Sequence, residues 1–122
     1  MLKNLLLVGL GGSIGSMVRY ATSFLIKSKS FPYATLSVNI IGCFIIGLVF
    51  AISIKDETLS DNWKLFLITG ICGGFTTFSA FSLENMSLLQ SGKIGMAATY
   101  ILLSVVLGIA ATLLGYQLIS KG

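Results

Sequence analysis

The sequence has few charged residues and contains no histidine. Lysine, arginine, aspartate and glutamate together make up 10% of its 122 residues, whereas soluble globular domains carry about 25% of these residues. Hydrophobic residues make up 55% of the chain, and the mean hydropathy is +0.96. No arrangement of such a chain covers its apolar surface with polar groups. The composition therefore predicts that lipid surrounds most of the chain.

The same scarcity excludes several classes of function. Without histidine there is no imidazole base, proton shuttle or imidazole metal ligand. The two cysteines, Cys43 and Cys72, lie inside apolar runs, which argues against a disulfide framework and a thiolate metal site. The four acidic residues lie outside these runs, so an enzyme that uses acid–base chemistry is not expected. The basic residues are scattered singly, and the net charge of +4 does not indicate a nucleic-acid-binding surface.

Four apolar runs are long enough to cross a bilayer, whose hydrocarbon core of about 30 Å requires about 20 helical residues. They cover residues 4–26, 34–54, 65–83 and 94–119, and short polar connections separate them. A secretory signal peptide has a shorter apolar core ahead of a soluble domain, so the first run is expected to stay in the protein. The runs predict an all-α, multi-pass membrane protein with one transmembrane domain of residues 1–122, and the plasma (inner) membrane is the expected location.

The basic residues show no preferred orientation of this four-helix protein. With four spans both chain ends lie on one side, and lysine and arginine in short loops normally mark the cytoplasmic side. The basic residues on the two sides are Lys3, Lys55, Lys64 and Lys121 against Arg19, Lys27, Lys29 and Lys93. An equal count predicts insertion in both orientations; the alternative is one orientation that so few charges do not reveal. Dual insertion favours an antiparallel two-fold homodimer, and small residues four apart, such as Gly11 and Gly15, suit close packing with a second copy.

The third run contains a sequence that weakens a helix at mid-membrane. Gly73 and Gly74 are followed, after Phe75, by Thr76 and Thr77. A helix break at this depth frees backbone groups that no water can satisfy, so protein or a bound ion must take them up. Carbonyls turned outward suit a small hard cation, and the N-terminus of the next half-helix suits an anion. The alternative is a continuous helix whose glycines allow close packing.

Polar side chains inside the apolar runs are few, and each is a candidate for function because lipid solvates it poorly. Asn39 lies about one turn inside the second run, where its amide either presents a donor to an anion or bonds to another helix. In the fourth run Tyr100, Ser104 and Thr112 fall on a four-residue repeat, with Gly108 in the gap. They share one ridge of the predicted helix, which is either a packing surface or a ladder of hydroxyl donors along a pathway.

Two aromatic residues and one cation complete this set. Phe78 and Phe81 share a helix face and either pack against neighbours or lipid, or turn their positive ring edges toward a narrow passage. Arg19 either extends to the membrane surface or places its charge in a water-filled vestibule. The buried side chains thus supply donors and one cation but no acid. This pattern predicts a pathway for an anion.

Three segments, residues 11–20, 35–42 and 70–81, resemble the Fluc (CrcB) fluoride-channel family in order and in span. The run Gly-Gly-Phe-Thr-Thr-Phe-Ser and the earlier Val-Asn carry most of the resemblance, which covers essentially the whole chain. The resemblance implies a passive fluoride-selective channel that exports cytoplasmic fluoride and lowers its toxicity. It also implies an antiparallel, dual-topology homodimer with two pores.

The resemblance also implies a role for individual residues. Phe78 and Phe81 match the pore phenylalanine pair of the family, and Asn39 matches its pore asparagine. Arg19 matches the vestibule arginine. Tyr100, Ser104 and Thr112 match the polar track of the last helix. A structural sodium ion (Na+) would lie on the dimer axis, bound by the backbone carbonyls of Gly73 and Thr76 from each subunit.

Two positions depart from the family pattern, and other functions remain as alternatives. Ala80 stands where threonine is usual, and Gly108 stands where the track often has a hydroxyl, so each position lacks a possible donor. A small multidrug-resistance-type proton-coupled antiporter has similar length and dual insertion, but it requires a carboxylate inside the membrane. The first run contains no acid, and Glu84 lies at the end of the third. A non-transporting accessory subunit is a further alternative.

Overall fold

The computed structural model describes residues 1–27, 30–55 and 60–120. Within them, four helical segments are long and apolar enough to cross a membrane. The first two are α1 (Leu2–Leu25) and α2 (Tyr33–Lys55), and the last is α6 (Ile94–Ser120). The third consists of α3 (Asp61–Lys64), the π-helix η1 (Leu65–Cys72), α4 (Gly73–Phe75) and α5 (Phe78–Gln90). Of the charges counted above, Lys29 and Lys121 lie outside the described residues.

The third helical segment is longer than the apolar run from which it was predicted. It begins at Asp61, because the Ser60 side chain caps the helix by accepting a hydrogen bond from the Trp63 backbone N–H. It ends at Gln90, seven residues beyond the apolar run 65–83. Polar residues continue a helix readily once it reaches the membrane surface. This extension brings Glu84 into α5 and toward α2 and α6.

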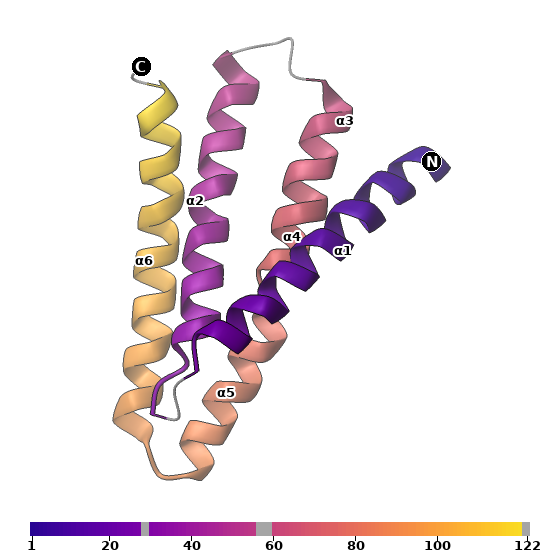
Figure 1. The fold of residues 1–122 in the computed structure, drawn as a ribbon. Coiled ribbons are helices and arrows are strands. Elements are labelled where there is room, and N and C mark those ends of the chain that lie inside the picture. Colours follow the sequence, from indigo (N-terminus) through magenta and orange to yellow (C-terminus); the bar gives the residue numbers. More distant parts are fainter. Residues whose placement is uncertain (28–29, 56–59, 121–122) are drawn as a thin grey trace.

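Two close helix crossings shape the molecule (Figure 1). α2 and α6 lie side by side, and a Cβ added at Gly47 would collide with the Thr112 carbonyl. α1 runs diagonally across the third segment, where a Cβ at Gly15 would collide with the Ile71 carbonyl. The closely spaced small residues therefore pack helices of the same chain, and they are not free for the contact with a second copy that we expected of them.

The third segment changes direction at Thr76 and Thr77, between α4 and α5. Thr76 has φ −86° and ψ 158°, and Thr77 has φ −150° and ψ 124°, so both residues are extended. Each side of this junction has its own cap. Thr76 donates through its backbone N–H and its hydroxyl to the Cys72 carbonyl, while the Thr77 hydroxyl accepts from the Ala80 N–H at 3.2 Å.

The start of α1 and the end of α6 lie toward one end of the molecule, and the α5–α6 connection lies at the other end (Figure 1).

Candidate functional site

The two phenylalanines predicted to line a pathway lie together at the start of α5. The ring centroids of Phe78 and Phe81 are 5.6 Å apart, and the Phe81 ring lies 5.0 Å from the ring of Tyr100 on α6. Phe78 and Phe81 line an open cavity of about 190 Å³ together with Asn39, Ser104 and Val105. The structure thus brings residues of α2, α5 and α6 to one place. We call this cavity the central hollow.

Asn39 binds the extended junction with both ends of its side-chain amide. Its Oδ1 accepts from the Thr77 N–H at 2.8 Å, and its Nδ2 donates to the Thr77 carbonyl at 3.1 Å. In a continuous α-helix the Thr77 N–H would instead donate to the carbonyl of Gly73. Asn39 therefore holds the junction in place, and because its side-chain amide has two N–H groups, it can donate a second hydrogen bond.

The hydroxyl groups along α6 differ in what they bind. The Tyr100 hydroxyl donates to Glu84 Oε1 at 2.8 Å. Thr112 Oγ1 donates to the carbonyls of Cys43 and Gly108 at 3.1 and 3.2 Å. Ser104 Oγ is buried and has no hydrogen-bond partner among the described residues. Of the three hydroxyls predicted to form a ladder, Ser104 is the one positioned to donate to a ligand in the central hollow.

Glu84 is a half-buried acid on α5 that the set of candidate residues did not include. Its Oε2 accepts from the Thr35 hydroxyl and its Oε1 from the Tyr100 hydroxyl, both at 2.8 Å. Sequence reasoning missed Glu84 because the third apolar run, which ends at residue 83, was taken as the length of the helix; Thr35 lies inside the second run but was not among the candidates. The available signal was spacing: Glu84 lies three residues after Phe81, so both lie on one face of a continuing helix.

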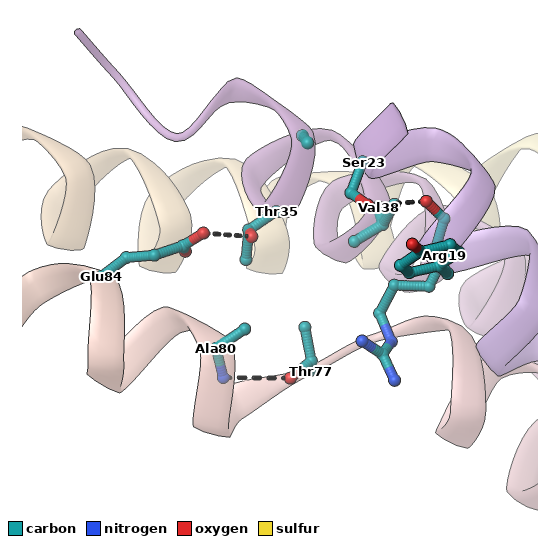
Figure 2. Close-up of a pocket in the computed structure, with 9 residues that line it drawn as sticks. Arg19, Ser23, Thr35, Val38, Thr77, Ala80 and Glu84 are labelled. Atoms are coloured by element: carbon teal, nitrogen blue, oxygen red, sulfur yellow. Dashed lines mark hydrogen bonds between the residues drawn. The ribbon is translucent and has the colours of Figure 1, made fainter. Parts of the chain in front are cut away.

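Arg19 and Glu84 line a second cavity, of about 170 Å³, on the α1 side of the junction. In Figure 2 the guanidinium group of Arg19 points toward the segment that carries Thr77, while Glu84 faces Thr35 on the other side. The Arg19 Nε donates to the Gly74 carbonyl at 3.1 Å. Arg19 thus bonds to α4 within the same chain, and its place in a water-filled vestibule stays a prediction. Ala80 also lines this cavity, so the missing hydroxyl there leaves an apolar wall.

The carbonyls of Gly73 and Thr76 have the chemistry that a small hard cation requires. Both carbonyls lie at or next to the junction. In an α-helix each would accept a hydrogen bond from the backbone N–H four residues later, but here those N–H groups donate to side chains. The Thr77 N–H donates to Asn39 Oδ1, and the Ala80 N–H donates to Thr77 Oγ1. Both carbonyl oxygens are therefore released from the α-helical pattern. Carbonyl oxygen is a ligand type suited to alkali and alkaline-earth cations, so these groups fit sodium.

Comparison with known proteins gives consistent matches over nearly the full chain. A family model described as "CrcB-like protein, Camphor Resistance (CrcB)" matches residues 6–116. "Fluoride-specific ion channel FluC" of Azobacteroides pseudotrichonymphae genomovar. CFP2 is 50% identical over 121 residues, which cover 97% of each chain. The protein of the same name from Flavobacterium psychrophilum is 50% identical over 117 residues, 93% of this chain and 94% of the relative. "Fluoride-specific ion channel FluC 1" of Yersinia pseudotuberculosis is 44% identical over 123 residues, 99% of this chain and 97% of the relative.

Proposed function

The chain belongs to the CrcB-like protein family, and on that premise we propose that it is a fluoride-selective channel. It is a multi-pass protein of the plasma membrane and not an enzyme. Fluoride leaves the cytoplasm passively through it, down the electrochemical gradient, and the toxicity of the ion inside the cell falls. The observation that carries this proposal is the central hollow, to which three helices bring an amide, a hydroxyl and two aromatic rings but no acid.

The chemistry of the central hollow suits a small anion. Fluoride is strongly hydrated, so it leaves water only where donors replace the lost hydrogen bonds. Asn39 and Ser104 offer an N–H and an O–H, and the rings of Phe78 and Phe81 offer positive edges. Several weak contacts allow an ion to leave again, whereas one strong site would trap it.

The antiporter alternative requires a carboxylate inside the membrane, and Glu84 is the residue that could supply it. Both oxygens of Glu84 accept hydrogen bonds from hydroxyls, those of Thr35 and Tyr100. The carboxylate is thus engaged in joining α5 to α2 and α6. The relatives carry the name of a fluoride channel, so no observation favours the antiporter over the channel.

The functional unit in this proposal is an antiparallel pair of chains with two pores. The side chain of Phe78 is 77% exposed in the single chain although it lines the central hollow. One wall of the pathway is therefore missing, and a second copy in the opposite orientation completes it. The equal number of basic residues on the two sides of the chain supports insertion in both orientations.

The proposal places the junction between α4 and α5 at mid-membrane and on the two-fold axis. The backbone carbonyls of Gly73 and Thr76 from both chains would hold a structural sodium ion there. Such an ion would supply positive charge to carbonyl oxygens that have lost their helical donors. Asn39 and Arg19 fix the same junction from α2 and α1, through Thr77 and Gly74.

A pair of charge variants tests the antiparallel assembly. Asn62→Lys with Gln117→Lys adds positive charge at the end that carries the chain termini, and Gln90→Lys with Ser91→Lys adds it at the other; all four positions are exposed. Each variant alone is expected to insert mainly in one orientation and to lose most of its fluoride efflux in proteoliposomes. Co-expression of the two variants restores it. Full efflux from either variant alone, when protease accessibility shows one orientation, would refute the antiparallel pair.

A further inference from the structure

Glu84 joins three helices through the two oxygens of its carboxyl group. On α5 it accepts a hydrogen bond from the Thr35 hydroxyl of α2 and another from the Tyr100 hydroxyl of α6, both at 2.8 Å. Thr35 is 8% exposed, and Tyr100 is fully buried. Within the described part of the chain, no basic side chain forms an ion pair with Glu84. The carboxyl group therefore serves as a pair of acceptors for two buried hydroxyls.

The ring of Tyr100 packs against a phenylalanine that borders the central hollow. The centroids of Tyr100 and Phe81 are 5.0 Å apart, and their ring planes are inclined at 60°. On α5, Phe81 and Glu84 are three residues apart and share one helix face. Tyr100 thus contacts both residues, since its hydroxyl binds Glu84 and its ring packs against Phe81.

Tyr100 itself does not border the central hollow. The residues that line the hollow are Asn39, Phe78, Phe81, Ser104 and Val105. A tyrosine hydroxyl has one hydrogen to donate, and in this structure Glu84 accepts it. Tyr100 is therefore placed to act on the hollow through the ring of Phe81 and not by donating to an ion.

The orientation of the Phe81 ring decides what an anion in the hollow meets. An aromatic ring is positive at its edge and negative on its face, so a ring that turns its face inward repels an anion. We propose that Glu84 is a positioning residue for fluoride conduction. It holds the hydroxyl of Tyr100, and Tyr100 in turn keeps the edge of Phe81 toward the ion. The inference rests on the proposed fluoride channel and gives its buried acid a role that uses the oxygen atoms as acceptors and not the charge.

The first experiment removes the hydrogen bond while it keeps the ring. Fluoride efflux is measured from proteoliposomes that contain equal amounts of assembled protein. Tyr100→Phe is expected to lower efflux about three- to tenfold, the loss that one modest hydrogen bond represents. Glu84→Gln keeps an acceptor oxygen for Tyr100, and its amide can donate to the Thr35 hydroxyl, so it is expected to retain at least about half of the efflux.

Tyr116 provides a matched control, because it is a tyrosine of the same helix whose ring contacts Phe50. Tyr116→Phe is expected to conduct as the unmodified chain does. Unchanged efflux from Tyr100→Phe would overturn the inference. So would a loss in Glu84→Gln as large as that in Tyr100→Phe, because the charge would then be what Glu84 contributes. Absence of fluoride efflux from the unmodified chain would instead overturn the proposed function.

A second experiment tests whether Tyr100 acts through Phe81. Once the ring of Phe81 is gone, the Tyr100 hydroxyl has nothing left to position, so the two substitutions are expected not to add. Phe81→Ile with Tyr100→Phe is expected to conduct within about twofold of Phe81→Ile alone, measured against protein-free vesicles. A further loss in the double variant as large as that of Tyr100→Phe alone would show that Tyr100 acts independently of the ring and would contradict the positioning role.

Discussion

Replacing Asn39 with aspartate is expected to lower fluoride efflux at least about 100-fold. The change keeps the shape of the side chain but replaces Nδ2, which donates to the Thr77 carbonyl at 3.1 Å, with an oxygen. The two acceptors then face each other, and a buried group loses its partner at a cost of about 1–3 kcal/mol. The new charge also repels an anion at 4 Å by about 4 kcal/mol even at an effective dielectric constant of about 20.

The control for this variant is the same chemical change outside the pathway. Asn62 lies on the exposed surface of α3, so Asn62→Asp is expected to leave efflux unchanged. Efflux is measured with a fluoride electrode on vesicles that contain equal amounts of each assembled protein. Equal efflux from Asn39→Asp and Asn62→Asp would show that Asn39 neither holds the junction nor borders the ion route.

Replacing Phe81 or Phe78 with isoleucine is expected to lower fluoride efflux about tenfold or more. Isoleucine keeps an apolar side chain but removes the ring and with it the positive edge that an anion requires. The Phe81 substitution also removes the ring that lies between Phe78 and Tyr100. The substitution is expected to lower ion conduction and not to affect assembly, so size-exclusion chromatography is expected to show an intact dimer.

A matched phenylalanine separates the role of the pair from a general need for aromatic residues. Phe50 on α2 is 52% exposed and contacts Tyr116, away from the central hollow. Phe50→Ile is expected to conduct as the unmodified chain does. Unchanged efflux in both Phe78→Ile and Phe81→Ile would contradict a role of the ring edges in fluoride selectivity. Asn39 and Ser104 would then be the remaining donors.

Much of the architecture follows from hydropathy, because a chain with so few charges has lipid as its solvent. The four apolar runs coincide with four helical segments long enough to cross a membrane. Their ends were less predictable, since a helix can continue beyond its apolar run into polar sequence. α5 does so as far as Gln90, and the apolar run, which ends at residue 83, therefore did not show that Glu84 bonds to residues of α2 and α6.

The grouping of Asn39, Phe78, Phe81 and Ser104 was predicted from their residue types and from the resemblance to a family, and the structure brings them to one cavity. The partner of each polar group was not predictable, because it depends on how helices far apart in sequence approach one another. Asn39 is engaged by Thr77 across 38 residues, and Thr112 by Cys43 across 69. Periodicity along one helix places a hydroxyl on a ridge, but it does not show whether that hydroxyl is free to donate.

Ion efflux from vesicles that contain only the purified chain tests whether the protein provides a passive route for fluoride that excludes a larger halide. The vesicles are loaded with potassium fluoride or potassium chloride, without a pH gradient, and efflux is started with a potassium ionophore. Fluoride is expected to leave the vesicles rapidly, and chloride is expected to stay inside. Vesicles that retain fluoride, or that release chloride at the same rate, would contradict a selective fluoride route.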